Sequence, residues 1–399
     1  MYRLFLRALA AIALLSTFWP VLRFAGLAAF DWLGLAVVIA AFPYRVRVKP
    51  GSASSFQTPL LGLLLLVCGA YLSVLSSWDP LDHVRKVAEL FLDYSMMLSF
   101  AYVLSRKNIL SLSEVLTLLA VSGAVSSVVC ILQGQFGLLK SLMPPDEMGS
   151  LARMNGLTEW PIEAGRVSAY SAVISVGLAI NRRPQWLLYV LLAVIDLYSM
   201  QYSASLTAVF GLIAGMTALL LFSKSYVGLF ALGIAAFGLL AVALPSGLLG
   251  PLTSRLEGMA RDQENYATLR IREIQWDQTV QLIDARTILL GNGYSVADLP
   301  GGDIHNAVLA SVFHFGLVGL ISQLLLIWFA VGRLLGDAPR SSKAILLGCI
   351  CIFCADYLTG PAFARRALWI PLFLIAAYLP ERRSSHSRPE LLGRAPGSI

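Results

Sequence analysis

His305 and Asn306 stand where a polar segment meets a long apolar segment that begins at Ala307. Asn is a preferred N-cap residue, so Asn306 is predicted to cap a helix that starts there. Capping does not explain His305. The dipole at a helix N-terminus disfavours a charged imidazole, so His305 is expected to be neutral and able to accept a proton. Two roles stay open for His305: a structural contact, or a catalytic base.

Upstream of His305, apolar residues recur at helical spacing at Leu269, Trp276, Val280 and Ile283. This spacing predicts an amphipathic helix with one apolar face. Arg272 lies one turn before Trp276 and is predicted to share that face. An arginine on a buried face needs an anionic partner.

Three partners are open for Arg272. Glu273 or Asp277 would form an ion pair with it, lipid headgroups would attract it by snorkelling, and a phosphate would accept a bidentate pair of hydrogen bonds. Arg270 lies off the apolar face and is a second, weaker candidate for the phosphate. Gly291-x-Gly293 then predicts a turn.

Within the segment that follows Asn306, His314 is interpreted as a packing or hydrogen-bonding residue. Gly316 and Gly319 are interpreted as sites of close helix contact.

The composition dictates the setting of these residues. Of 399 residues, 57% are hydrophobic and 13% are charged, and the mean hydropathy is +0.74. A soluble domain would expose such an excess of apolar residues, whereas a membrane protein needs roughly 20 of them for each spanning helix. The apolar runs are continuous rather than alternating, which favours helices over a barrel.

About twelve spanning helices are predicted. They are expected at 5–24, 26–42, 58–76, 87–104, 110–132, 165–181, 186–202, 205–222, 226–244, 307–332, 344–359 and 367–380. The chain therefore divides into an N-terminal membrane region (1–244), a large loop containing a helix (245–306), a C-terminal membrane region (307–380) and a disordered tail (381–399).

Positive charge predicts the orientation. Arginine and lysine recur in the short loops at 43–57, 105–109, 182–185, 223–225 and 333–343 and in the tail. The positive-inside rule puts these segments, and both termini, in the cytoplasm. The net charge of +7 is thus a topology signal, and no nucleic-acid partner is expected. The polar segments 133–164 and 245–306 fall on the outer side, where the arginines of the second segment need another explanation.

No metal site is predicted. The five cysteines lie inside apolar runs, and Cys351 and Cys354 form a CxxC without a partner cluster of His or carboxylates. No DxD or HExxH motif is present either.

Several of these features together resemble the O-antigen ligase and O-antigen polymerase superfamily. His305-Asn306 followed by Gly316-x-x-Gly319 looks like its signature, and Arg272-x-x-x-Trp276 followed by Gly291-x-Gly293 is similar to its large-loop segment. "RMNGLTEWPIEAG" (153–165) and "SASLTA" (203–208) resemble two further family segments. The chain departs from the pattern in "ARTILLGNG", which lacks a Pro before Gly-x-Gly, and in lacking an aromatic residue directly after Asn306.

The resemblance implies a GT-C-like, polytopic all-α glycosyltransferase of the bacterial inner membrane. Such an enzyme moves a glycan from undecaprenyl pyrophosphate to an acceptor sugar on the periplasmic face, without cofactor or metal and with inversion. The implied roles fall on these residues: His305 and Asn306 as catalytic, and Arg272, Arg153, Arg270, Arg166, Arg365 and Trp276 as substrate-binding.

Two questions stay open at this stage. The acceptor is either another lipid-linked repeat, which defines a polymerase, or a lipid A–core sugar, which defines a ligase. The alternative from another class is a lipid-linked glycan flippase or other transporter, in which Glu89, Asp93 and Asp356 would relay protons.

Overall fold

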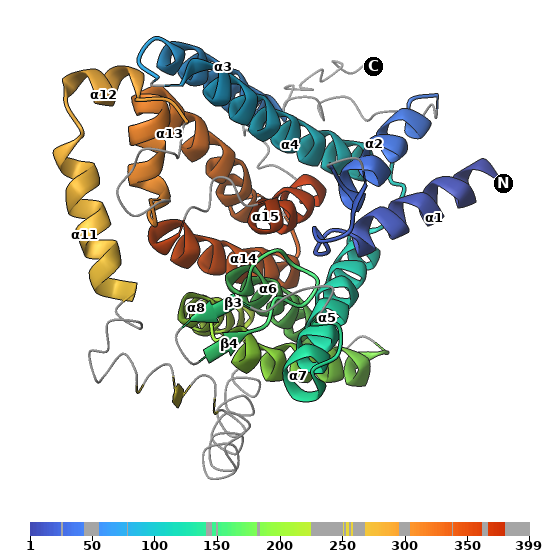
Figure 1. Ribbon diagram of the computed structural model, residues 1–399. Coiled ribbons are helices and arrows are strands. Elements are labelled where there is room, and N and C mark those ends of the chain that lie inside the picture. The colour runs from blue at the N-terminus through green and yellow to red at the C-terminus, as the bar shows by residue number, and fades with distance from the viewer. Residues whose placement is uncertain are drawn as a thin grey trace, which may run out of the picture.

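The computed structural model is almost entirely helical (Figure 1). In the described residues the remaining regular elements are two antiparallel strand pairs, β1 (Arg23–Phe24) with β2 (Leu27–Ala28) and β3 (Asp146–Met148) with β4 (Leu151–Arg153). The structure describes residues 1–24, 27–43, 56–77, 79–140, 146–148, 151–181, 184–224, 268–294, 304–336, 338–360 and 366–379, with isolated positions between 250 and 257.

Seven helices of the described chain are long and apolar enough to cross a membrane, as in a polytopic α-helical membrane protein. They are α3 (Gln57–Val74), α4 (Pro80–Arg106), α5 (Leu112–Phe136), α7 (Trp186–Ser203), α8 (Leu206–Ser223), α13 (Ala307–Leu334) and α14 (Arg340–Thr359).

The other described helices are shorter or more polar. They are α1 (Tyr2–Leu15), α2 (Ala29–Ala41), α6 (Pro161–Ile180), α11 (Thr268–Gln281), α12 (Ala285–Leu290) and α15 (Arg366–Tyr378). Helix α6 is long enough to span, but Glu163 and Arg166 lower its hydropathy. It is nevertheless the centre of the bundle, because nearly all its residues are buried against α5, α7, α8 and α14.

Eleven of the predicted spans coincide with a helix in the structure. The twelfth, at 226–244, lies outside the described residues, as does the tail at 381–399. The loop at 245–306 is described mainly at α11 and α12 and contains helix, as expected.

The predicted first span, 5–24, is wrong in extent. Helix α1 ends at Leu15, and the Ser16 and Thr17 hydroxyls both donate to the Ala13 carbonyl oxygen. Pro20 then prevents a helix from resuming, because it lacks an N–H and disfavours helix in the residue before it. The apolar run therefore continues as irregular chain into β1.

Small residues let the central helices approach closely. A Cβ on Gly69 of α3 would lie 3.0 Å from the Gly319 nitrogen of α13, and a Cβ on Gly215 of α8 would lie 2.8 Å from the Gly348 oxygen of α14. The prediction of close helix contact at Gly319 is thus confirmed. Such contacts replace the hydrophobic driving force that helices in lipid lack.

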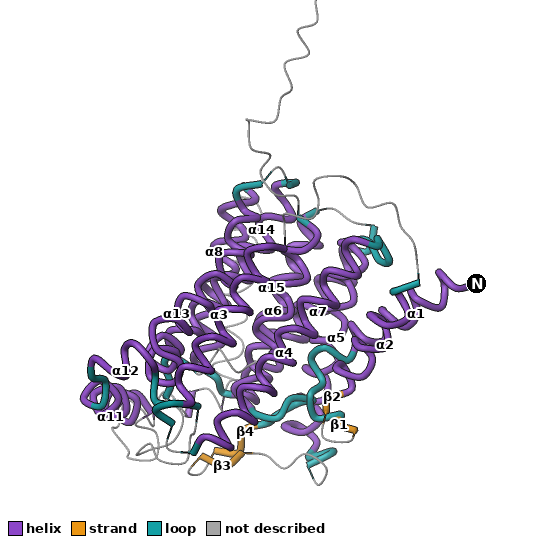
Figure 2. Tube along the Cα trace, turned by 90° about the horizontal axis from the view of Figure 1, so that it is seen from above, coloured by secondary structure: helices purple, strands orange, loops and turns teal. Residues whose placement is uncertain are grey.

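The elements outside the long helices gather at one end of the bundle. Figure 2 shows α11, α12 and both strand pairs toward the same end. Helix α11 contacts α13, and α12 contacts both α13 and α3. This end of the molecule carries Arg272 of α11 and the residues that precede α13, His305 and Asn306.

Candidate active site

Helix α13 is interrupted at Gly316, where the backbone adopts φ 65° and ψ −166°. The carbonyl groups before the interruption accept hydrogen bonds from the Gly-x-Gly segment. The Asn292 N–H donates to the Phe313 oxygen at 2.7 Å, and the Gly293 N–H donates to the His314 oxygen at 3.1 Å. We call this docking of Gly291–Tyr294 on Phe313–Gly316 the glycine junction.

The glycine junction requires glycine at both of its contact points. Gly291 has φ 75°, and a Cβ there would lie 2.5 Å from the His314 oxygen. A Cβ on Gly316 would lie 2.7 Å from the Leu289 oxygen. Two backbones thus meet where no side chain fits, and both glycines lie in the left-handed region. Gly316 therefore breaks the helix and admits a loop, rather than serving helix contact as predicted.

Two histidines hold the glycine junction in place. His314 is buried, and its Nδ1–H donates to the Gly293 oxygen at 2.8 Å, which confirms its predicted hydrogen-bonding role. His83 of α4 accepts from the Tyr294 N–H through Nδ1, while its Nε2 lies 2.9 Å from the Ala70 oxygen. These backbone partners fix the tautomer and orientation of both rings.

Helix α12 is tied to α3 beside the junction. The Ser76 hydroxyl donates to the Gly291 oxygen, and an Arg286 N–H donates to the Leu75 oxygen at 3.2 Å. Asp284 caps α12 by accepting from the Thr287 N–H at 2.7 Å. This hydrogen bond lowers the pKa of the Asp284 carboxyl. The helices between the two membrane regions are thereby anchored to the bundle.

Asn306 caps α13 as predicted. Its side-chain oxygen accepts from the Val308 N–H at 3.0 Å and the Leu309 N–H at 3.1 Å. His305 precedes the cap and is half-buried. Its Nδ1 lies 3.2 Å from Oε1 of Gln275 on α11. Because an amide oxygen only accepts, Nδ1 carries the proton in this contact and Nε2 is the basic nitrogen.

The inner face of α11 is polar, contrary to the predicted apolar face. Gln275 and Thr279 are 6% and 2% exposed, whereas Val280 is 55% exposed. Arg272 is half-buried on the same side, since residues three and seven apart share a helix face. The apolar spacing misled because this helix turns polar side chains toward the candidate site and leaves an apolar residue at the surface.

Arg272 lies in a charged environment built by distant parts of the chain. Burial lowers the pKa of its guanidinium, Arg166 of α6 lowers it further, and Asp356 of α14 acts in the opposite direction. The group stays cationic at physiological pH, because the ordinary arginine pKa is far above 7. Neither Glu273 nor Asp277 forms an ion pair with it in the described part of the chain.

Arg166 and Asp356 form a buried ion pair between α6 and α14, with side chains 5% and 2% exposed. Arg166 was predicted to assist in binding phosphate. The structure gives this arginine a carboxylate partner, which offsets its charge and joins two central helices. A buried pair of this kind depends on both members, since removing one leaves an unpaired charge in the interior.

Arg153 is also buried, at the end of β4. Its Nε–H donates to the Ser203 oxygen at the end of α7, at 3.1 Å. The next backbone N–H, of Met154, donates to the Tyr202 oxygen at 2.9 Å. Arg153 thus fastens the β3–β4 hairpin to α7.

Three predicted substrate-binding residues remain: Trp276, Arg270 and Arg365. Trp276 is half-buried one turn beyond Arg272, and its indole N–H has no hydrogen-bond partner among the described residues. Arg270 belongs to α11, but its side chain lies outside the described residues, as does Arg365.

The arrangement brings His305, which precedes α13, against the face of α11 that also carries Arg272. Gln275, which orients His305, lies three residues after Arg272 and therefore beside it. Such a site is able to hold an anion and to accept a proton from a neighbouring group. Within the described ranges no group of three or more His, Cys, Asp or Glu side chains is placed to hold a metal.

Sequence reasoning missed two contributors. Gln275 had a usable signal, because it lies on the Arg272 face of the predicted helix. The Arg166–Asp356 pair had none, because 190 residues separate its members and only the packing of α6 on α14 brings them together.

Neither the models of known protein families nor the sequences of characterised proteins yield a match to this chain.

Proposed function

We propose that this protein is a membrane glycosyltransferase that moves a glycan from a polyprenyl pyrophosphate, undecaprenyl pyrophosphate in bacteria, to an acceptor sugar. The observation that carries the proposal is the contact between His305 and Gln275. It commits Nδ1 as a donor and leaves Nε2 as the nitrogen that accepts a proton. Motif order along the chain, which resembles the O-antigen ligase and polymerase superfamily, supplies the donor class.

The proposed step is a direct displacement. The acceptor hydroxyl oxygen forms a bond to the anomeric carbon, while the bond between that carbon and the pyrophosphate oxygen breaks. The bonding electron pair leaves with the pyrophosphate, and the hydroxyl proton passes to His305 Nε2. One displacement inverts the anomeric centre.

Arginine supports the departure of the pyrophosphate in this proposal. Arg272 is cationic and makes no ion pair with the described carboxylates, so its guanidinium is the best candidate for a phosphate ligand. Trp276, with its indole N–H one turn away, is a candidate sugar or phosphate contact. Arg153 and Arg166 are proposed to support the site without contacting the phosphate. Arg153 fastens the β3–β4 hairpin to α7, and Arg166 pairs with Asp356.

The proposed site lies on the periplasmic side of an inner membrane, in a GT-C-like arrangement. The positive-inside rule supports this orientation, since the α11 end of the bundle is opposite the basic loops. Glu273→Cys on α11 and Arg340→Cys at the start of α14 test it, because both positions are exposed. With Cys68 and Cys354 replaced by Ser, a membrane-impermeant thiol reagent should label residue 273 in spheroplasts and residue 340 only in inverted vesicles. The opposite pattern would overturn the periplasmic assignment.

A proton-coupled transporter is less well supported. Of the carboxylates that such a relay would use, Glu89 pairs with Arg85 at 3.2 Å on an exposed surface, and Asp356 pairs with Arg166. Both contacts account for these charges without transport.

Purified protein in proteoliposomes with a polyprenyl-pyrophosphate-linked repeat tests the function. Transfer releases polyprenyl pyrophosphate and yields a longer glycan, whereas a flippase moves the lipid without product. A ladder formed without lipid A–core indicates a polymerase, and product formed only with lipid A–core indicates a ligase. If no glycan product forms with or without lipid A–core, the proposal is contradicted.

A further inference from the structure

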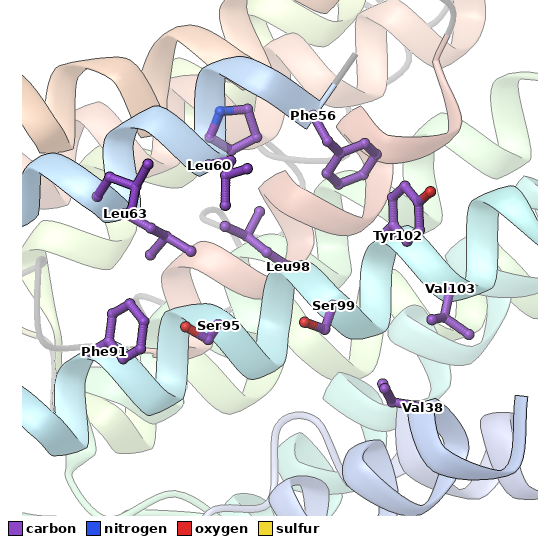
Figure 3. A pocket seen from close by; sticks show the side chains of 12 residues that line it. Val38, Phe56, Leu60, Leu63, Phe91, Ser95, Leu98, Ser99, Tyr102 and Val103 are labelled. Carbon is purple, nitrogen blue, oxygen red and sulfur yellow. The ribbon is translucent and has the colours of Figure 1, made fainter. Parts of the chain in front are cut away.

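A cavity of about 450 Å³ lies between α3 and α4, with α2 at one edge (Figure 3). Its volume falls within the roughly 300–1,000 Å³ usual for small-molecule sites. The walls are apolar, and Leu60 and Leu64 on its rim are 58% and 57% exposed. Since these helices are long enough to span a membrane, the groove faces lipid rather than water.

The groove is far from the candidate active site. Phe56 on its wall packs against Phe329 of α13, with ring centroids 5.3 Å apart. His305 precedes the other end of α13, and the intervening helix is roughly 35 Å long at 1.5 Å per residue. The groove therefore lies at the end of the bundle opposite His305, the end that the positive-inside rule puts in the cytoplasmic leaflet.

Two serines of α4 give the groove polar points. Ser95 and Ser99 of α4 both line the groove (Figure 3). The Ser95 hydroxyl oxygen is inaccessible to water and has no hydrogen-bond partner among the described residues. The Ser99 hydroxyl lies at an exposed position of the same apolar wall, so it is the polar group that a ligand in the groove can reach.

Positive charge marks one end of the groove. The Arg106 guanidinium lies over the rings of Phe56 and Tyr102, 5.8 Å from each centroid, and both rings line the groove. Lys107 follows, with Nζ 2.8 Å from the Ala41 oxygen. An apolar channel with cations at its membrane-surface end complements a lipid with a negatively charged headgroup.

We infer that this groove binds an anionic phospholipid of the cytoplasmic leaflet. One acyl chain lies between α3 and α4, an ester oxygen accepts from the exposed Ser99 hydroxyl, and the headgroup phosphate lies beside Arg106. This lipid differs from the proposed glycan donor in its leaflet and in its site, so the inference stands independently of the proposed function.

Native mass spectrometry of the detergent-purified protein with added phosphatidylglycerol tests the inference. The wild type should retain one phosphatidylglycerol in preference to phosphatidylethanolamine. Ser95→Phe fills the groove and Arg106→Gln removes the charge, and each should reduce retention about fivefold or more. Ser99→Phe, at an exposed position in the same groove, provides a second filling variant with less risk to folding.

Matched controls lie on the same helix outside the groove. Leu92→Phe, at a 63% exposed position, and Arg85→Gln, at the opposite end of α4, should retain phosphatidylglycerol as the wild type does. Equal retention by wild type, Ser99→Phe and Arg106→Gln would overturn the inference. Displacement of phosphatidylglycerol by equimolar undecaprenyl phosphate would also overturn it, because the groove would then select a polyprenyl chain.

Discussion

The glycine junction and the inner face of α11 each hold a histidine, but they hold it differently. His314 and His83 contact backbone groups of the glycine junction and of α3. His305 contacts a side-chain amide on α11 and is only half-buried. A ring fixed by backbone is part of the framework, whereas Gln275 selects the His305 tautomer in which Nε2 is the basic nitrogen.

The same contrast separates the two arginines. Arg166 is buried and paired with Asp356, while Arg272 is half-buried and makes no ion pair with the described carboxylates. The difference indicates that the Arg166 guanidinium is neutralised by Asp356 and joins α6 to α14. Arg272 is therefore the arginine suited to an external anion.

The largest expected difference is between replacing His305, which should lower the transfer rate, and replacing His314, which should lower the stability of the fold. His305→Ala should lower the transfer rate by about 10²–10⁴-fold, the usual contribution of a general base, with no change in thermal unfolding. His314→Ala should lower the unfolding temperature and the yield of folded protein, because the Gly293 oxygen loses its donor. Transfer rates per folded molecule in proteoliposomes measure the first effect. Full activity in His305→Ala would remove the distinction between the two sites.

Arg272→Ala should reduce kcat/KM for the lipid donor by about 10–100-fold, since charge-assisted hydrogen bonds contribute about 1.5–3 kcal/mol. Arg272→Lys should recover part of this loss, because it keeps the charge without the bidentate geometry. Titration of the donor at fixed acceptor measures the effect. Glu273→Gln is the matched control at an exposed neighbouring position, and an equal loss there would show that α11 responds only to disturbance of its fold.

Within the glycine junction, Gly316→Ala should destabilise the protein by about 1–3 kcal/mol, the cost of a non-glycine residue in a strained backbone region. The new Cβ would also meet the Leu289 oxygen. Gly332→Ala, in a regular part of the same helix with open space around it, should stabilise by about 0.5–1 kcal/mol. Unfolding in detergent measures both, and similar stability of the two variants would argue against the junction.

The smallest expected change comes from the residue that orients His305. Gln275→Ala should lower the transfer rate by about tenfold, less than the roughly 10⁴-fold loss when a charged triad partner is altered, because a neutral amide only selects the tautomer. Gln278→Ala, at the adjacent turn of α11, should leave the rate unchanged. Single-turnover transfer rates at saturating donor distinguish the Gln275→Ala variant from the Gln278→Ala variant. A rate for Gln275→Ala equal to that of Gln278→Ala would assign Gln275 to packing alone.

The sequence predicted the helices well, because each apolar run of sufficient length has one stable form in lipid. It failed in the first span, where Pro20 outweighs hydropathy, and on α11, where Gln275 and Thr279 are buried and Val280 is exposed. Asn306 was predictable because capping is local. The Arg166–Asp356 pair was not, because 190 residues separate its members. The glycine junction was not either, because its two segments meet only where Gly316 interrupts α13.

The most direct test of the account is the transfer rate of the Arg272→Ala/His305→Ala double variant, reconstituted with a polyprenyl-pyrophosphate-linked glycan and its acceptor. The account predicts transfer near background, with a loss smaller than the product of the two single losses, because groups that act on one transition state are not additive. Transfer at the wild-type rate by a folded double variant would contradict the assignment of this site.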